Sequence, residues 1–403
     1  MSLTAISTLT FQTNALDSIE ALEQNLSTTQ NELSTGISLQ NAADNPAAMV
    51  EVNQLNTQLS ASQQYSTNGN LVSTNLKLEE QALTNATNVL QSVQSLADEA
   101  NNSSLSSAQR QDIATQLSQQ LQQLVSIGNS TDGNGNYLFS GYASTTQPFA
   151  QNGGSVTYSG AAETTQVQVG ADQSVSTSDT GSSVFMNIAA GNGTFTTAAA
   201  AANTGTASIG PGTVADPAEW QAASGSYTIS FTSPTAYQIT NSSGTVLTTG
   251  TYDGTTGGTI SFNGIQVAIN GDPATGDQFT VAPAGTSSAF ATIQGLITTL
   301  NSTGLNSGQL ATQISQSIEQ LSSAVNNLND VQASVGARIN AVTTAQTTET
   351  SDQTAYQTQI SNLSQTDYAA ATTQLSSEEV ALQAAEESYA SLAKLSLFNY
   401  ISG

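Results

Sequence analysis

Three adjacent pairs of glutamates are the residues in this sequence whose type best suits acid–base chemistry. They are Glu79/Glu80, Glu378/Glu379 and Glu386/Glu387. Two carboxylates can share the work of acid and base only when both face one substrate bond. Adjacent residues on a helix point about 100° apart, so neither pair member can assist the other. The three pairs are therefore predicted to lie on solvated helix faces.

Asp132, Asn134 and Asn136 have the spacing with which a calcium-binding loop begins. Such a loop has glycine at its sixth position and an acidic residue at its twelfth, whereas this sequence has Tyr137 and Ala143 there. An ordinary turn is the better interpretation, and we predict no metal site.

The 403 residues include no histidine and no cysteine. This composition excludes thiol nucleophiles, disulfides, a Ser-His-Asp triad and zinc sites built from those ligands. No glycine-rich motif that could cradle a phosphate is present. We therefore predict no catalytic residues, no cofactors and no enzyme activity.

The net charge of −25 arises because basic residues are almost absent. The four that occur are Lys77, Arg110, Arg338 and Lys394. Nucleic acids and anionic membranes attract clusters of Lys and Arg, so neither is an expected partner. The first residues lack the basic and apolar regions of a cleaved signal peptide, and no apolar run is long enough for a membrane span. Export without a cleaved signal is the expectation.

Apolar residues spaced by seven dominate both ends of the chain. Such a repeat places one apolar residue on the same helix face every two turns, and that face needs a partner. Because both ends carry the repeat, we predict that they pair as a long antiparallel coiled-coil stalk. The rows are Leu76, Leu83 and Leu90; Ile314, Leu321, Leu328, Val335 and Val342; and Tyr368, Leu375, Leu382 and Tyr389.

The middle of the chain has a different pattern, rich in Gly and Thr, with alternating apolar residues and hairpin signals. The predicted class is therefore α+β and multi-domain, with a β-rich domain inserted into the stalk. Residues 190–215 are Ala- and Gly-rich and are predicted to be a loose loop. The predicted strands are 166–169, 227–231, 245–249, 259–262 and 265–269, and the predicted helices are 3–40, 47–100, 107–129 and 288 to the end.

Three predicted domains follow from these changes of pattern. Residues 1–45 and 355–403 form a terminal helical domain, residues 46–145 and 288–354 form the stalk, and residues 146–287 form the β-rich outer domain.

Several segments of the two ends resemble the bacterial flagellin family. The segments that carry this resemblance are Leu33-Ser-Thr-Gly36, Ala42–Ala47, Leu90–Ala97, Ser107–Ile113 and Gly336–Asn340. Three others are similar to the hook-associated branch of that family, namely Gly135–Gly141, Gly264–Phe279 and the ending Leu395–Ile401. Ser92 and Ser95 stand where many flagellins carry arginine for innate receptors, so receptor recognition is not expected.

The resemblance implies a non-enzymatic structural protein at the junction between the flagellar hook and its filament. It further implies type III export, a chaperone, an extracellular location, and contacts with copies of itself, a neighbouring hook-associated protein and flagellin. The alternatives are filament flagellin, a coiled-coil surface adhesin, or a secreted enzyme with coiled regions. An adhesin would need a signal or an anchor, and an enzyme would need an acid–base pair.

The last residues form a dense apolar cluster at a chain end that is otherwise polar. Burial of such side chains against neighbouring subunits would remove the cost of exposing them. Together with the apolar residues of the first helix, they form a predicted subunit interface. Its residues are Leu16, Ile19, Leu26, Leu33, Leu382, Tyr389, Leu395, Leu397, Phe398 and Ile401.

Overall fold

The computed structural model describes residues 3–223, 225–254 and 256–401, with side chains described from residue 10 to residue 391 within these ranges. The chain divides into two compact units. One unit contains the residues up to 66 together with those from 347 onward, and the other contains residues 67–346.

Long helices account for both ends of the chain, as predicted. They are α1 (Leu3–Thr35), α2 (Pro46–Ala100), α3 (Ser107–Gly128), α5 (Ala289–Asn301), α6 (Ser307–Ser364) and α7 (Tyr368–Ile401). The first helix ends earlier than predicted because Gly36 has a φ of 72°, a left-handed conformation that stops a helix. The last predicted helix is three helices, with breaks at 302–306 and 365–367.

Local side chains determine where the shorter helices begin. Ser106 and Gln109 form a reciprocal capping box at the start of α3. Ser288 caps α5, and Asp216 caps the short helix α4 (Pro217–Ala222), whose first residue is proline.

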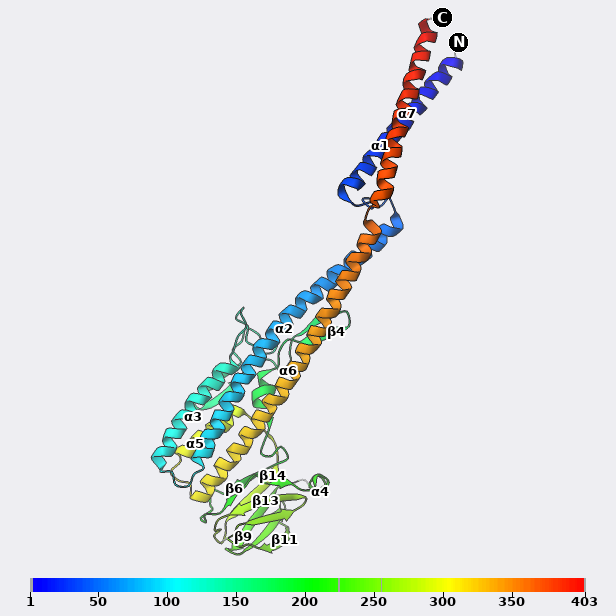
Figure 1. Ribbon diagram of the computed structural model, residues 1–403. Coiled ribbons are helices and arrows are strands. Elements are labelled where there is room, and N and C mark those ends of the chain that lie inside the picture. Colours follow the sequence, from blue (N-terminus) through cyan, green and yellow to red (C-terminus); the bar gives the residue numbers. More distant parts are fainter. Residues whose placement is uncertain (1–2, 224, 255, 402–403) are drawn as a thin grey trace. The chain divides into compact units, whose positions relative to one another are not determined.

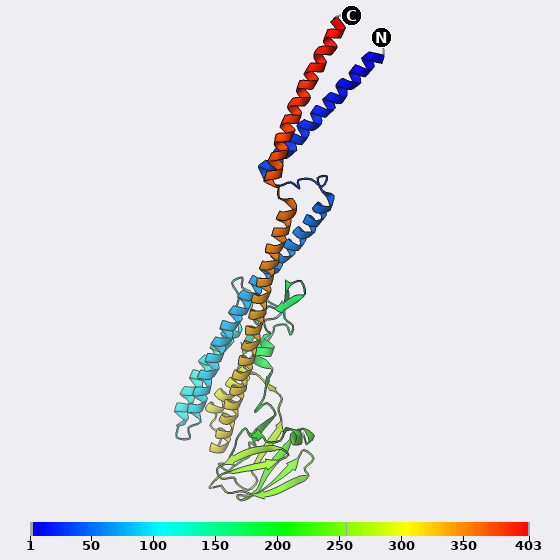
Figure 2. The same ribbon diagram turned by 45° about the vertical axis from the view of Figure 1, so that its right-hand side comes forward.

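In the unit 67–346, helices α2, α3, α5 and α6 lie side by side (Figures 1 and 2). Gln346 of α6 bonds to Asn70 of α2, and Gln332 of α6 bonds to Thr84 of α2. Later residues of α6 therefore lie beside earlier residues of α2. The two long helices are therefore antiparallel. The predicted rows meet in this bundle: Leu76, Leu83, Leu90, Ile314, Leu321, Leu328, Val335 and Val342 are all buried.

The segment that follows α3 packs onto this bundle and shares its core. It holds two hairpins, β1 (Phe149–Asn152) with β2 (Ser155–Tyr158) and β3 (Gln166–Gly170) with β4 (Gln173–Ser176). A short π-helix, η1 (Ser182–Met186), comes next. Phe139, Phe149 and Phe185 are fully buried in the same cluster as the helix rows.

A second core lies between two antiparallel sheets farther along the chain. One sheet has the strand order β11-β10-β9-β14-β6, and the other has β12-β13-β7 with β8 also paired to β13. Inward residues of both sheets form one cluster around Phe195, Phe231 and Phe279. The strands of these two sheets are β6 (Phe195–Ala199), β7 (Ser208–Ile209), β8 (Thr213–Val214), β9 (Tyr227–Ser233), β10 (Ala236–Asn241), β11 (Val246–Thr251), β12 (Gly258–Phe262), β13 (Ile265–Asn270) and β14 (Gln278–Pro283). The short strands β5 (Ile188–Ala189) and β15 (Thr286–Ser287) pair with each other.

The prediction of a loose loop at 190–215 is wrong. This segment contains β6, β7 and β8, and β6 pairs along its whole length with β14. Phe195 is fully buried there and packs against Trp220, with 5.5 Å between ring centroids. One large anchor and a distant partner strand therefore order a segment whose other residues are small.

The predicted boundaries of the β-rich domain, 146 and 287, stay a prediction. The two cores indicate that the separable part is shorter, because buried residues between 149 and 188 belong to the first core. Ala190 donates its backbone N–H to the carbonyl of Gly285 at 2.9 Å, so the two ends of the segment between them are adjacent. We expect that a short Gly-Ser link in place of 191–284 leaves the helices and the first core intact.

Replacement of 150–285 is the matched comparison, because it also removes Val169, Val184 and Phe185 from the first core. Loss of one buried phenylalanine costs roughly 3–5 kcal/mol. The shorter replacement should keep the helical circular dichroism and the urea midpoint, and the longer one should lower that midpoint. Equal loss of stability in both variants would show that the sheets and the helices share one cooperative core.

Candidate assembly surface

Helices α1 and α7 pair with each other through a narrow seam. Along each helix, the shielded positions alternate in steps of three and four, which is the a/d pattern of a coiled coil. On α1 they are Gln12, Ala15, Ile19, Leu22, Leu26, Thr29 and Leu33; on α7 they are Ala371, Leu375, Glu378, Leu382, Ala385 and Tyr389. Most of them are only half-buried, so one partner helix covers this face incompletely.

The structure places five of the predicted interface residues in this seam: Ile19, Leu26, Leu33, Leu382 and Tyr389 are half-buried along it. These five side chains therefore pack between α1 and α7 of the same chain.

Leu16 is different, because it lies beside the seam and 48% of it is exposed. Phe11 and Val380 are also exposed, by 55% and 67%. Apolar side chains exposed on a helix pair of this kind suit contact with another molecule. The remaining predicted interface residues, Leu395, Leu397, Phe398 and Ile401, have side chains outside the described residues, although α7 remains helical to Ile401.

Tyr368, the first residue of the predicted row on α7, is not shielded as a seam position would be. It is 52% exposed, because it begins the helix beside the break at Gly36. A Cβ at Gly36 would lie 2.9 Å from the exposed Tyr368 hydroxyl, which can move, so glycine is favoured there mainly by its positive φ.

The two breaks in the helices are joined by backbone hydrogen bonds. Ser38 donates its N–H to the carbonyl of Ser364 at 2.8 Å, and Thr366 donates its N–H to the carbonyl of Gly36 at 3.0 Å. Asp367 then caps α7 by accepting the N–H groups of Ala369 and Ala370. The breaks after α1 and after α6 therefore lie side by side.

Carboxylates meet across the seam close to these breaks. Burial, and then the negative charges of Asp44 and Glu378, raise the pKa of Glu32 above its usual value. Among the side chains that the structure describes in this unit, no lysine or arginine offsets that repulsion. The contribution of Glu32 to pairing is therefore greatest at acid pH and decreases as the pH rises through its raised pKa.

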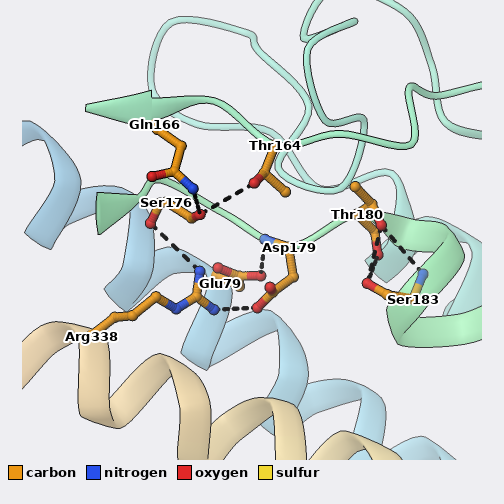
Figure 3. A network of polar contacts seen from close by, with 8 residues as sticks. All are labelled: Glu79, Thr164, Gln166, Ser176, Asp179, Thr180, Ser183 and Arg338. Carbon is orange, nitrogen blue, oxygen red and sulfur yellow. Dashed lines mark hydrogen bonds and ion pairs between the residues drawn. The ribbon is translucent and has the colours of Figure 1, made fainter. Parts of the chain in front are cut away.

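The prediction of solvated helix faces is wrong for Glu79. Glu80, Glu379, Glu386 and Glu387 are exposed, but Glu79 is fully buried, and Glu378 is half-buried in the α1–α7 seam. It accepts the N–H of Asp179, whose carboxylate is paired with Arg338 (Figure 3).

This trio was not predicted, although the sequence contains one signal of it. Arg338 follows Val335 by one turn, next to a buried row, and a base in that position needs an acidic partner.

The segment around Asp132 is a turn, which confirms the prediction. Its Oδ1 accepts the N–H groups of Asn134 and Asn136, both at 2.8 Å. Within the described ranges, no three acidic side chains come together as they would around a metal ion. A search of the same residues found no helix with the length and hydropathy of a membrane span.

Comparison with known families identifies the class of protein first. Residues 6–144 match the bacterial flagellin N-terminal helical region, and residues 198–283 match the D2-like domain of flagellar hook-associated protein 1. The helical ends and the β-rich middle thus define a flagellin-type chain with a hook-associated outer domain.

Individual relatives narrow this class. FlgL of Xanthomonas campestris is 34% identical, with a TM-score of 0.70 over 76% of this chain and 99% of that one. The flagellar junction protein FlgL of Legionella pneumophila is 31% identical, with a TM-score of 0.65 over 73% of this chain and 99% of that one. The chain belongs to the FlgL family, whose members are also called flagellar hook-associated protein 3.

Curated relatives match over a shorter stretch. Flagellar hook-associated protein 3 of Escherichia coli (strain K12) is 30% identical over 157 residues, which is 39% of this chain and 49% of that protein. The chain thus spans about half the length of this curated relative.

The seam and the surface beside it can be separated by one pair of substitutions. Ile19→Ser removes a half-buried side chain, so it should weaken the α1–α7 pair by about 1 kcal/mol, or about fivefold in amide exchange across residues 10–35 of the monomer. Leu16→Ser is the matched control, and exchange should stay within about a factor of two because Leu16 is exposed. Equal effects of both variants would contradict the assignment of the seam.

Proposed function

We propose that this protein is a structural subunit of the bacterial flagellum that joins the hook to the flagellin filament. The observation that carries this proposal is its similarity to the Legionella junction protein, which extends over 99% of that chain. A catalytic role has no support from the residues, because the buried carboxyl groups of Glu79 and Asp277 are engaged in structural hydrogen bonds to backbone N–H groups.

The proposed partners are copies of this chain in a ring-like layer, a neighbouring hook-associated protein, flagellin and an export chaperone. Helices α1 and α7 would make the contacts within the assembly. Their seam is incompletely covered, Phe11 and Leu16 remain exposed beside it, and Val380 is exposed elsewhere on α7. The proposed location is extracellular, after export without a cleaved signal peptide.

Filament flagellin is the alternative closest in kind, because it shares the N-terminal helical region. Two features favour the junction role: the match of residues 198–283 to a hook-associated domain and the similarity to FlgL chains over nearly their whole length. A surface adhesin would not account for either feature.

Deletion of the gene in its own bacterium tests the proposal. A junction protein is needed to attach the filament but not to build the hook or to export flagellin. Cells should therefore keep bare hooks and release full-length flagellin into the medium, and the gene supplied in trans should restore filaments. Filaments of normal length on the deleted cells would overturn the proposal, and loss of flagellin itself would indicate filament flagellin.

The predicted apolar contact at the end of the chain can be tested in the same cells. Replacement of Leu395, Leu397, Phe398 and Ile401 by serine removes side chains whose burial is worth about 1.5–3 kcal/mol each. We expect the variant protein to be secreted together with flagellin while the hooks stay bare.

A control variant carries serine at Glu379, Gln383, Glu386 and Glu387, which are exposed on α7. It should assemble filaments, because no apolar burial is lost. Normal filaments on cells with the first variant would show that the terminal apolar cluster is not an assembly contact.

A further inference from the structure

A buried carboxyl group fastens the segment after β4 to the helical bundle. Glu79 of α2 has no exposed surface, and its Oε1 accepts the backbone N–H of Asp179 at 2.8 Å. The Asp179 carboxylate is paired with Arg338 of α6 (Figure 3). Three separate parts of the chain thus meet at two carboxyl groups and one guanidinium.

The charges in this trio do not balance when both carboxyl groups are ionised. Arg338 can neutralise one negative charge, and its ion pair is with Asp179. The Oε2 atom of Glu79 and the Nε atom of Arg338 are buried without a hydrogen-bond partner. An ionised Glu79 would therefore place an unpaired negative charge inside an apolar bundle and beside a second carboxylate, which is strongly unfavourable.

These surroundings favour the neutral form of Glu79. Burial, and then repulsion by Asp179, raise the pKa of Glu79 to about 8, although the Asp179 N–H and the Arg338 charge act in the opposite direction. Asp179 and Arg338 are the charged groups that act on it from the elements packed against α2. On α2 itself, Lys77 and Glu80 are exposed.

The segment held by this trio connects the β3–β4 hairpin to the first core. Thr180 precedes η1 and its hydroxyl accepts the N–H of Ser183, and Phe185 of η1 is fully buried. The Phe185 ring lies 5.4 Å from that of Phe139 and 5.5 Å from that of Phe290, measured between centroids. Asn327 of α6 also donates to the carbonyl of Val184 at 2.9 Å.

The two ends of this segment are therefore held differently. Aromatic packing and an uncharged amide hold η1, and neither responds to pH. The stretch from Ser176 to Asp179 depends on the trio, since Arg338 also reaches the Ser176 carbonyl at 3.5 Å.

We propose that Glu79, Asp179 and Arg338 form a pH-responsive latch, which fastens residues 176–179 to α2 and α6 when Glu79 is protonated and releases them when Glu79 ionises in mildly alkaline solution. We expect the helical bundle to stay folded in both states, because many apolar side chains besides Glu79 hold it together. The β3–β4 hairpin also stays attached, since Val169 and Val175 belong to the first core and Asn68 of α2 donates to the Gln168 carbonyl at 2.8 Å, so the latch acts on residues 176–179 alone.

The sign of the pH dependence follows from the raised pKa of Glu79. In the released segment Glu79 is in contact with water and has the ordinary pKa of a glutamate, so release is accompanied by loss of a proton. The latch is therefore fully stable below about the ordinary value of 4.5, weakens as the pH rises from there, and reaches its weakest state once the pH exceeds about 8.

Hydrogen exchange of residues 176–179 between pH 6 and pH 9, corrected for intrinsic rates, tests the latch in the full chain. Since each pH unit below the raised pKa changes the release equilibrium about tenfold, protection should decrease by tenfold or more over this range. Protection of α3 should not change. Pulses at pH 9 followed by return to pH 6 should recover the protection.

Glu79→Gln keeps an acceptor for the Asp179 N–H but cannot ionise, so its protection should not vary over the same range. Glu80→Gln is the matched control at the exposed neighbour and should behave as the unchanged protein. The latch is refuted when protection of the unchanged protein is independent of pH, or when Glu79→Gln shows the same decrease.

Asp179→Asn gives a second, independent test should Glu79→Gln not fold. It removes the repelling carboxylate and leaves Arg338 next to Glu79, so the pKa of Glu79 should drop. The loss of protection should then occur at a lower pH than in the unchanged protein. An unchanged or higher midpoint in this variant would overturn the proposal.

Discussion

Much of the unit 67–346 depends on the two faces of α6. One face carries the apolar row from Ile314 to Val342 that packs in the bundle. The other carries amides that bond to the backbone of the chain's middle segment: Gln309 donates to the carbonyl of Ala201 at 3.0 Å, and Gln320 accepts the N–H of Gly191 at 2.9 Å. A segment packed against a helix needs partners for its backbone groups, and glutamine supplies both a donor and an acceptor. The many amides of this sequence are therefore partly structural.

The sequence predicted the helices well and one strand region badly, for reasons that lie in the residues. A row such as Leu76, Leu83 and Leu90 forms an apolar helix face that must pack against something, so its burial can be predicted without knowing the fold. The 190–215 segment has no such signal: its strands exist because β14 lies beside β6 and because Phe195 enters a core built mostly by later residues. Strand formation there is a tertiary effect, which a local pattern of Ala, Gly and Thr does not encode.

The candidate site shows the same limit in another form. Spacing by seven identifies a helix face that will be covered, but it does not identify what covers it. Ile19 and Leu382 belong to the seam within the chain, whereas Leu16, close to Ile19 in sequence, remains exposed. Glu79 illustrates the converse error, because a carboxylate adjacent to another was expected in water and is instead buried through contacts with residues far along the chain.

The two units are stabilised by different means, and this difference bears on assembly. The unit 67–346 buries large side chains completely and pairs the half-buried Arg338 with an acid. The α1–α7 pair has mostly half-buried seam residues and, among its described side chains, charges of one sign only. Because its apolar residues are incompletely buried and its charges repel one another, the α1–α7 pair could be stabilised by further burial. In the proposed assembly, a neighbouring subunit that covers Phe11 and Leu16 would add apolar burial to this pair.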